Sequence, residues 1–399
     1  MKTILITGCC GFIGSHLNDF FLKKNFKVIG VDNLLTGNLD NIKHNKKNKN
    51  FRFINHDICQ PLELNEQIDF ILHFASTASP ADYLKYPIKT LKIGSLGTEN
   101  VLKIGLKKNS VVLVASTSEI YGDPLEHPQN EKYFGNVNPV GPRGVYDEAK
   151  RYLEAITTAY KTKYKLKIRI VRIFNTYGPR MRINDGRAIP NFINQALNNQ
   201  DFTIYGDGSQ TRSFSYIDDT VKGIADLLKT DYQSPVNIGN PNEYSINELI
   251  QTIKKLIPSN GNIIYKELPE NDPKVRKPDI DLAQKILNWK PTVKLENGLI
   301  KTIDYYKNLG LNVVPGSGLL AAVVPGAFDA WMLLLLNHGS MKLSDVLEPA
   351  ISISQKGYPL VPNIINTIPK IAPVLALSKL FSMISKLVDP VNPYISEHP

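Results

Sequence analysis

The sequence predicts an α/β fold built on a doubly wound parallel sheet, and two observations carry this prediction. Short apolar, β-branched segments alternate with helical patterns, and a glycine-rich loop joins the first such segment to the first helix. We expect strands at 2–7, 27–31, 51–55, 70–73, 111–115 and 167–172, and helices at 12–24, 98–108 and 146–164. This alternation is typical of a parallel sheet that is covered by helices on both faces.

The glycine loop has the spacing of a dinucleotide site. Gly8, Gly11 and Gly14 follow the first strand at intervals of three. Glycine permits a tight turn, a close backbone approach to a pyrophosphate, and close packing of helix on strand. The next strand ends at Asp32, where a carboxylate can bind the adenosine ribose hydroxyls and repel a 2′-phosphate. The pattern predicts a Rossmann-type site that prefers NAD to NADP.

A tyrosine and a lysine four residues apart suggest proton transfer. Tyr146 and Lys150 lie on one face of a predicted helix. A free tyrosine has a pKa of about 10, and a nearby ammonium together with a positive nicotinamide would lower it. The stretch Ser116–Tyr121 brings hydroxyls and a carboxylate to the same sheet edge. Tyr146 and Lys150 could instead be a surface pair at helical spacing. Together with the glycine loop and the Ser116–Tyr121 stretch, however, they favour a nicotinamide enzyme of the short-chain dehydrogenase type.

Composition and charge are those of a soluble globular protein, with 42% apolar and 21% charged residues. The net charge is +10, but the densest basic run, at 43–50, lacks aromatic residues and lies between two predicted strands. We interpret it as a solvated loop and expect no nucleic-acid partner. A positive field also suits a doubly anionic nucleotide-sugar. Three cysteines without metal-ligand spacing, and no export signal, indicate a reduced, cytoplasmic protein without a bound metal.

Residues 1 to about 308 resemble extended short-chain dehydrogenases, and in particular UDP-glucuronate decarboxylases (UDP-xylose synthases). The matching stretches are VDNLLTGNLDNI, HFASTASPADYLKYPIKTLK, STSEIYGDPLEHPQNEKYFGNVNPVGPRGVYDEAK, RIFNTYGPRMRINDGR, GDGSQTRSFSYIDD and RKPDI. A sugar-nucleotide dehydratase would be expected to have Thr-Asp-Glu where this chain has Thr117-Ser118-Glu119. The missing aspartic acid argues against elimination of water.

The resemblance implies an NAD-dependent decarboxylation of UDP-glucuronate to UDP-xylose. The sugar would be oxidised at C4, lose its C6 carboxylate as carbon dioxide, and be reduced again. Tyr146 would deprotonate the C4 hydroxyl, and Lys150 would hold the nicotinamide ribose. Ser118 and Glu119 would orient the sugar and handle protons around C5, and we expect a raised pKa for Glu119.

The resemblance also assigns site residues by position. The catalytic set is Thr117, Ser118, Glu119, Tyr146 and Lys150. The cofactor set is Gly8, Gly11, Phe12, Ile13, Gly14, Asp32, Asn33, Thr36, Gly37, Asp57, Ile58, Ala75, Lys92, Tyr146, Lys150 and Thr176. The substrate set is Asn100, Tyr160, Asn175, Arg187, Arg212 and Arg276.

The same resemblance implies the domain organisation. An NAD-binding core would cover about 1–174, and segments 175–215 and 240–308 would form a smaller lobe that caps the cleft. The helices at 98–108 and 146–164 would form the interface of a homodimer.

The character of the chain changes after Asn308. The apolar stretch 318–336 is interrupted by Pro325, Gly326 and Asp329, so we expect no membrane insertion. Residues 323–360 resemble an internal piece of gamma-glutamyltranspeptidases, but nothing that follows corresponds to the threonine nucleophile of those enzymes. We therefore expect 309–399 to be a fragment without transpeptidase activity.

Alternative functions stay open at this stage. One is another UDP-sugar 4-epimerase or dehydratase, and another is a decarboxylase that releases the UDP-4-keto-pentose. A third is a dinucleotide-sensing protein without catalysis, which could dispense with Tyr146 and Lys150.

Overall fold

The computed structural model describes residues 1–267, 273 and 275–310. The chain divides into two compact units, Met1–Tyr306 and Lys307–Pro399. The apolar stretch at 318–336 and nearly all of the fragment expected at 309–399 lie outside the described residues. Those expectations therefore stay predictions.

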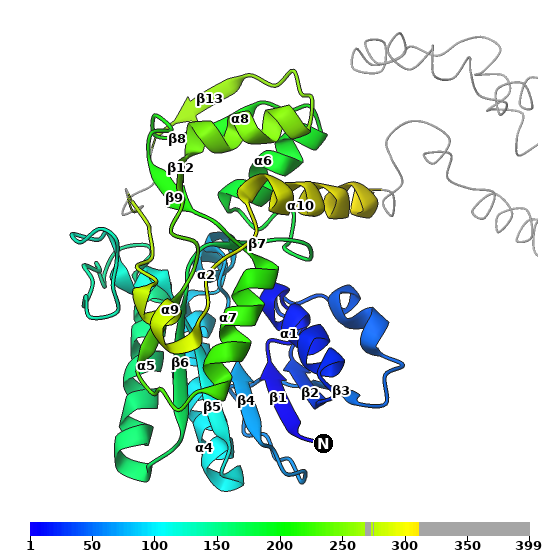
Figure 1. The fold of residues 1–399 in the computed structure, drawn as a ribbon, viewed down its shortest axis with the longest axis vertical. Helices are drawn as coiled ribbons and strands as arrows, with labels where there is room; N and C mark the ends of the chain where they lie inside the picture. Colours follow the sequence, from blue (N-terminus) through cyan, green and yellow to red (C-terminus); the bar gives the residue numbers. More distant parts are fainter. Residues whose placement is uncertain (268–272, 274, 311–399) are drawn as a thin grey trace, which may run out of the picture. The chain divides into compact units, whose positions relative to one another are not determined.

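A seven-stranded parallel sheet forms the centre of the first unit (Figure 1). Its order is β11-β6-β5-β4-β1-β2-β3, so the direction of winding reverses beside β1. The strands are β1 (Thr3–Thr7), β2 (Lys27–Asp32), β3 (Phe51–Asn55), β4 (Phe70–His73), β5 (Val111–Thr117), β6 (Ile168–Ile173) and β11 (Pro235–Ile238). The predicted doubly wound sheet is confirmed. Ligands on such sheets bind at the carboxyl edge where the winding reverses.

Helices cover both faces of this sheet. On one face lie α1 (Phe12–Lys23) and α7 (Ile217–Lys229). The other face carries α4 (Thr98–Lys108) and α5 (Gly144–Tyr164), with α3 (Pro87–Lys92) and a π-helical turn at Ile93–Gly97.

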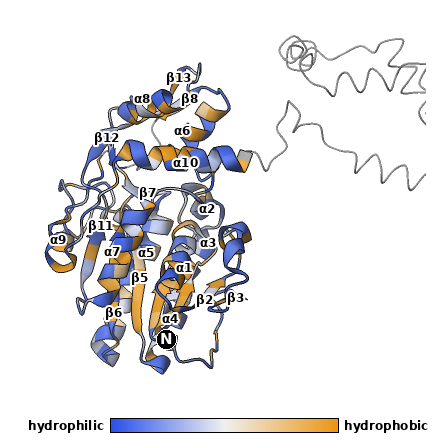
Figure 2. Ribbon diagram, turned by 45° about the vertical axis from the view of Figure 1, so that its right-hand side comes forward, coloured by the Kyte–Doolittle hydropathy of each residue, from blue (hydrophilic) through white to orange (hydrophobic). Residues whose placement is uncertain are grey.

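Alternation along the strands fills two apolar cores. Ile4 and Ile6 belong to the core that includes residues of α1 and α7, whereas Leu5 belongs to the core that includes residues of α4 and α5. Successive side chains of a strand point to opposite faces, so one strand serves both layers. Figure 2 shows the hydrophobic colour gathered on the central strands.

A smaller lobe lies beyond the carboxyl ends of the strands (Figure 1). It contains α6 (Ala188–Leu197), β8 (Phe202–Tyr205), β9 (Thr211–Ser213), β12 (Glu243–Ser245), α8 (Ile246–Leu256), β13 (Ile263–Lys266) and α10 (Leu295–Gly310). Strand β8 pairs with β13 and β9 pairs with β12. A capping box of Ser245 and Glu248 begins α8. Shorter elements are α2 (Pro80–Lys85), β7 (Thr176–Tyr177), β10 (Ser215–Tyr216), α9 (Asp281–Leu287) and 3-10 helices at Leu39–Asn45 and Ser118–Tyr121.

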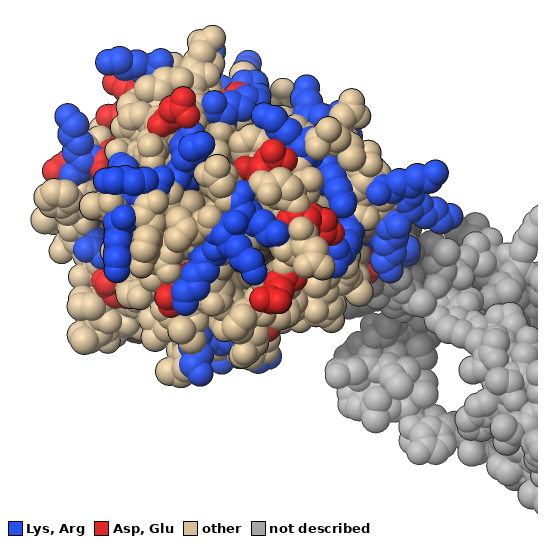
Figure 3. All heavy atoms as spheres, turned by 90° about the horizontal axis from the view of Figure 1, so that it is seen from below, with Lys and Arg blue, Asp and Glu red and all other residues tan. Residues whose placement is uncertain are grey.

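Lys and Arg side chains predominate on the face shown in Figure 3. The last turns of α1, α4 and α5 each carry lysines, which interact favourably with the negative end of a helix dipole. The basic run at 43–50, predicted as a loop, begins within the 3-10 helix Leu39–Asn45. Among the residues that the structure describes, no helix is long and apolar enough to cross a membrane.

Candidate active site

The glycine loop between β1 and α1 is shaped by contacts that exclude side chains. Gly8 has a φ of +72°, and its N–H donates to the carbonyl of Val31 at 2.8 Å. A Cβ on Gly14 would lie 2.1 Å from the carbonyl oxygen of Gly8. Gly11 precedes the first residue of α1 and offers no side-chain cap, so the first N–H groups of the helix can bind an anion.

Asp32, at the end of β2, supports this loop. Its two carboxylate oxygens accept hydrogen bonds from the backbone N–H groups of Cys10 at 2.9 Å and Leu34 at 2.8 Å. Burial raises the pKa of Asp32. The carboxylate is thus fixed at the carboxyl edge of the sheet, beside the loop.

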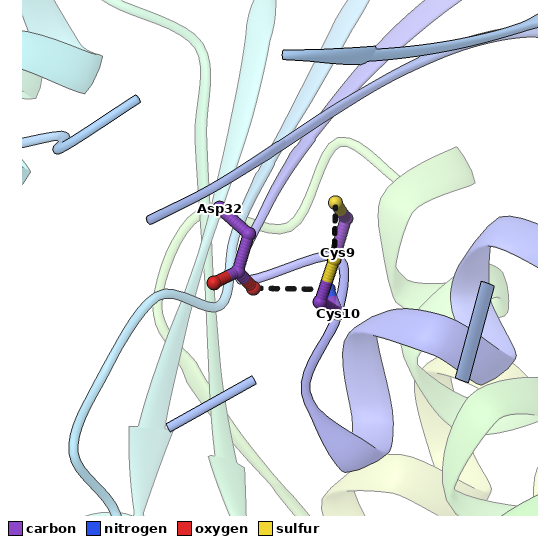
Figure 4. A group of neighbouring side chains, drawn as sticks. All are labelled: Cys9, Cys10 and Asp32. Atoms are coloured by element: carbon purple, nitrogen blue, oxygen red, sulfur yellow. Dashed lines mark hydrogen bonds between the residues drawn. The ribbon is translucent and has the colours of Figure 1, made fainter. Parts of the chain in front are cut away.

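Two thiols pack behind the loop (Figure 4). The Sγ atoms of Cys9 and Cys10 are 3.8 Å apart, and with a carboxylate oxygen of Asp32 they form a group whose atoms lie within 4.8 Å of one another. Both thiols are fully buried, and neither is among the residues that line the two cavities described below. Burial raises the pKa of Cys9. The sequence spacing did not suggest this group, because Asp32 comes from the next strand.

A cavity of about 600 Å³ opens between the sheet edge and the lobe. Most of the predicted residues line it: Gly8, Gly11, Phe12, Ile13, Gly14, Thr36, Thr117, Ser118, Glu119, Tyr146, Lys150, Asn175, Thr176, Arg187, Arg212 and Arg276. A smaller cavity at the end of β2 is lined by Asp32, Asn33, Gly37, Asp57, Ile58 and Ala75, together with Gly8, Gly11 and Thr36. The structure therefore gathers segments that lie far apart in the sequence.

Three predicted residues do not reach either cavity. Lys92 is exposed on α3, and Asn100 on α4 donates a hydrogen bond to the carbonyl of Ile58 at 2.9 Å. Tyr160 packs against Tyr164 near the far end of α5. The geometry gives no support for a ligand-binding role of these three residues.

Tyr146 and Lys150 are both buried on the first turns of α5. The Tyr146 ring stacks on Tyr83 with ring centres 5.3 Å apart, and the Lys150 Nζ lies 5.7 Å from the centre of the Tyr146 ring. The ammonium donates to the carbonyl of Ala115 at 2.8 Å, and burial lowers the pKa of Lys150 to about 8. Burial raises the pKa of Tyr146, against a smaller opposing effect of the Thr117 hydroxyl. The predicted lowering of this pKa included the charge of a bound nicotinamide, and the protein groups alone do not produce it.

Glu119 is held between two guanidinium groups. Arg143 forms an ion pair with its Oε2, and the Nη2 of Arg276 lies 3.5 Å from the same oxygen. Arg276 is 1% exposed and donates to the carbonyls of Ser118 and Gly122. Burial tends to raise the pKa of Glu119, but Arg276 and Arg143 lower it to about 2. The expectation of a raised pKa is wrong, because it did not include the two arginines.

Sequence reasoning missed Arg143 and Tyr83, both of which line the large cavity. Arg143 precedes Tyr146 by three residues, a spacing that places the two on one side of a helical turn. That spacing was the available signal for Arg143. Tyr83 comes from α2, and no sequence pattern connects it with Tyr146.

A buried polar network joins the helix that carries Tyr146 and Lys150 to the sheet. Arg172 on β6 donates to both oxygens of Glu154 on α5, at 2.9 and 2.8 Å, and Glu154 also accepts from Ser116 on β5. Such a bidentate pair fixes geometry as well as charge. The network therefore ties β5, β6 and α5 together one turn beyond Lys150.

Comparisons with known proteins agree with this geometry. The family described as GDP-mannose 4,6 dehydratase matches residues 5–302, and gamma-glutamyltranspeptidase matches residues 297–387. The chain is 48% identical over 306 residues to UDP-glucuronic acid decarboxylase 1 of Xenopus tropicalis. The match covers 77% of this chain and 72% of the relative. It is 46% identical over 311 residues to UDP-glucuronic acid decarboxylase 6 of Arabidopsis thaliana, covering 77% of this chain and 90% of the relative.

Solved structures show the same architecture. UDP-glucuronic acid 4-epimerase from Bacillus cereus, in complex with UDP-glucuronic acid and NAD, is 30% identical with a TM-score of 0.68 and covers 77% of this chain and 100% of that chain. UDP-glucose 4-epimerase from Thermotoga maritima, with UDP-glucose, is 27% identical to this chain with a TM-score of 0.70. The match covers 77% of this chain and 99% of the epimerase chain.

Proposed function

The chain belongs to the GDP-mannose 4,6 dehydratase family, and from that premise we propose that it converts UDP-glucuronate into UDP-xylose and carbon dioxide with NAD as cofactor. The observation that carries this proposal is its 44–48% identity to UDP-glucuronic acid decarboxylases. The cavity supports it, because two arginines beside Tyr146 suit a sugar that bears a carboxylate.

The loop residues fit a dinucleotide. Gly8 and Gly14 leave no room for a Cβ, and the loop presents the start of α1, where a pyrophosphate would bind. Asp32 would hold the adenosine ribose and disfavour a 2′-phosphate. When bound, NAD supplies a reversible acceptor for a hydride.

The residues of this chain manage the protons and the charge. Tyr146 takes the proton of the C4 hydroxyl as that carbon is oxidised, and Lys150 stabilises the phenolate. The resulting 4-keto sugar is a β-keto acid, so the C5–C6 bond electrons can delocalise into the ketone as carbon dioxide leaves. The enolate that remains takes up a proton from water at C5, which restores the ketone, and Tyr146 returns its proton to the oxygen on C4 when that ketone is reduced.

The nucleotide diphosphate would bind in the same large cavity. Asn175, Arg187 and Arg212 line it, and Arg187 is oriented by an ion pair with Asp185. Guanidinium groups match phosphate geometry, so these residues are the proposed diphosphate ligands.

A second candidate is the 4-epimerisation of the same UDP-sugar. It is favoured by the likeness to the UDP-glucuronic acid 4-epimerase, which binds a carboxylate-bearing sugar on the same fold. Release of the UDP-4-keto-pentose without reduction is the other outcome that the proposed chemistry allows.

The finer organisation belongs to the proposal as well. We assign the NAD-binding core to about 1–174, the substrate lobe mainly to 175–215 and 240–308, and an inactive fragment to 309–399. Exposed apolar side chains on α4 and α5, among them Leu106, Tyr152 and Tyr164, support a homodimer through these helices. All three cysteines are free thiols, which supports a cytoplasmic location.

The direct test is to incubate the protein with UDP-glucuronate and catalytic NAD, and to identify products by NMR and mass spectrometry. Carbon dioxide with UDP-xylose is the expected result. UDP-4-keto-pentose with accumulating NADH would reject the closed redox cycle and keep the decarboxylation. UDP-galacturonate without carbon dioxide would replace the proposal with the epimerase.

A further inference from the structure

The thiols of Cys9 and Cys10 have no role in the proposed chemistry, yet they lie beside the carboxylate that would hold the cofactor (Figure 4). Both thiols come from the loop after β1, and the carboxylate of Asp32 comes from the end of β2. One sulfur or oxygen atom of each residue lies within 4.8 Å of the other two. Thiolate sulfur and carboxylate oxygen are both ligands of zinc, so the cluster has the atoms of a metal site.

The distance between the two sulfur atoms fits a tetrahedral ion. Two thiolates that bind zinc at about 2.3 Å lie about 3.8 Å apart. The Sγ atoms of Cys9 and Cys10 are 3.8 Å apart in the structure. The two oxygens of Asp32 each accept one backbone N–H, and each keeps a second lone pair for an ion. A small turn of the carboxylate toward the sulfur atoms would therefore supply three of the four ligands of a tetrahedral site.

Two glycines leave the space that the thiols occupy. A Cβ on Gly30 of β2 would lie 2.7 Å from the Sγ of Cys9. A Cβ on Gly37 would lie 2.9 Å from the Cβ of Cys10 and 2.9 Å from an oxygen of Asp32. The sequence thus has glycine at the two positions where a side chain would push the ligand atoms apart.

Two amide side chains fix the backbone of both cysteines. Asn18 on α1 donates a hydrogen bond from Nδ2 to the carbonyl of Cys9 at 2.9 Å. Asn41 on the 3-10 helix donates from Nδ2 to the carbonyl of Cys10, also at 2.9 Å. Ligands that are already held in place lose little freedom when they bind, which favours the affinity for an ion.

The charge of a divalent cation suits this cluster. A buried thiolate or carboxylate is unfavourable unless a positive group compensates it. A divalent cation would supply that charge, and each thiol would release its proton to the solvent as its sulfur binds the ion.

We propose that Cys9, Cys10 and Asp32 bind a thiophilic divalent cation of the zinc class, and that this ion and NAD exclude each other. Asp32 lines the smaller cavity, where its carboxylate would hold the adenosine ribose of NAD. The exclusion rests on that proposed contact, because the ion turns the carboxylate toward the thiols and away from the ribose. Both thiols are fully buried, so the ion enters when the loop of the NAD-free protein opens. The protein is thus loaded either with its cofactor or with the ion.

The first test uses the full chain, reduced and freed of metal and NAD, with cadmium as a spectroscopic substitute for zinc. The whole sequence has three cysteines, so a sulfur-to-cadmium charge-transfer absorption can come only from Cys9, Cys10 and Cys59. We expect this absorption to saturate at one cadmium per chain and to be the same in Cys59→Ser. Magnesium prefers oxygen ligands and should not displace the cadmium. Loss of the absorption in Cys59→Ser overturns the inference.

The second test measures the exclusion by isothermal titration with cadmium and with zinc. If the ion and NAD exclude each other, NAD at about 100 times its dissociation constant weakens the apparent affinity for the ion about 100-fold. Titration of the ions into NAD without protein is the control. Equal affinity for the ion with and without saturating NAD overturns the inference. This measurement needs no substitution, so it does not depend on the folding of a variant.

Two variants remove one sulfur each. Cys9→Ser and Cys10→Ser should weaken cadmium binding by more than the about 10- to 100-fold that the loss of a hydrogen-bond partner of a metal ligand costs. Melting curves show whether each variant is folded, and Cys59→Ser is the matched control, since Cys59 lies outside the cluster. Cadmium binding of wild-type strength in either variant overturns the inference.

The proposed function is read separately, from the turnover of UDP-glucuronate by the metal-free protein. If UDP-glucuronate is decarboxylated while the ion and NAD bind together, the inference is wrong and the function stands. If UDP-glucuronate is not decarboxylated but the ion and NAD exclude each other, the proposed function is wrong and the inference stands.

Discussion

The dinucleotide-binding and sugar-binding parts of the proposed site are built in different ways. At the dinucleotide end, the loop from Gly8 to Gly14 and Asp32 come from one stretch of chain and use mainly backbone contacts. At the sugar end, Glu119, Arg143 and Arg276 come from three segments and are held by charge. At the dinucleotide end, an added side-chain atom would clash with the backbone. At the sugar end, a changed charge would disturb the ion pairs of Glu119.

The largest effect is expected where the two ends meet. Tyr146→Phe removes the hydroxyl that takes the C4 proton in the proposed function, so turnover of UDP-glucuronate should fall about 10²- to 10⁴-fold. NAD affinity, measured by fluorescence titration, should stay within about twofold, because the glycine loop is unchanged. Tyr152→Phe, on the exposed side of the same helix, is the matched control. Full activity in Tyr146→Phe would show that another group is the base.

A change of shape at the dinucleotide end comes next. Gly14→Ala places a Cβ 2.1 Å from the Gly8 carbonyl oxygen, which must move. We expect NAD affinity to fall about 10- to 100-fold, as for other overpacked sites. Binding of UDP, whose proposed ligands are Asn175, Arg187 and Arg212, serves as the control and should change little. NAD affinity equal to that of the wild type would mean that the loop is more adaptable than its contacts indicate.

A change of charge at the sugar end should have a smaller effect. Arg143→Gln removes one of the two guanidinium groups beside Glu119, and kcat/KM for UDP-glucuronate should fall about tenfold. Arg52→Gln is the control, since Arg52 forms an exposed ion pair with Glu66 elsewhere. The measurement is kcat/KM of the two variants in steady-state kinetics. An equal decrease in both variants would show that Arg143 has no special role in binding the sugar.

The smallest expected effect is on stability. Asp147 follows Tyr146 on α5, and burial raises its pKa in the folded protein to about 7 from its ordinary value of 3.8, so the folded state binds the proton more tightly. This contribution to stability is present below the unfolded pKa and is lost as pH rises through about 7. In Asp147→Asn this loss of stability at high pH is absent. The melting temperature of the variant minus that of the wild type should therefore be about 2 °C higher at alkaline than at acidic pH. A difference that is the same at both pH values would show that Asp147 does not titrate as described.

The same comparison explains what the sequence could predict. The strand–glycine–helix–strand–Asp pattern is local, so it predicted the parallel sheet. The structure confirms the six expected strands with bounds within two residues, whereas β11 was not predicted. The low pKa of Glu119 could not be predicted, because it depends on Arg276, whose contact with Ser118 spans 158 residues. Asn100 shows a second limit: it lies on a correctly predicted helix, but no sequence pattern indicated that its side chain donates a hydrogen bond to the carbonyl of Ile58.

The two thiols of the dinucleotide loop give the protein an internal reporter of the opening of this loop. Cys9 and Cys10 are fully buried, whereas Cys59 is partly exposed. A thiol reagent added to the native protein would label Cys59 first, and it would reach the other two only during opening of the loop. A ligand that holds the loop closed would slow that second labelling phase. The rate at which the loop opens can thus be measured by mass spectrometry in the natural sequence, without introducing a probe.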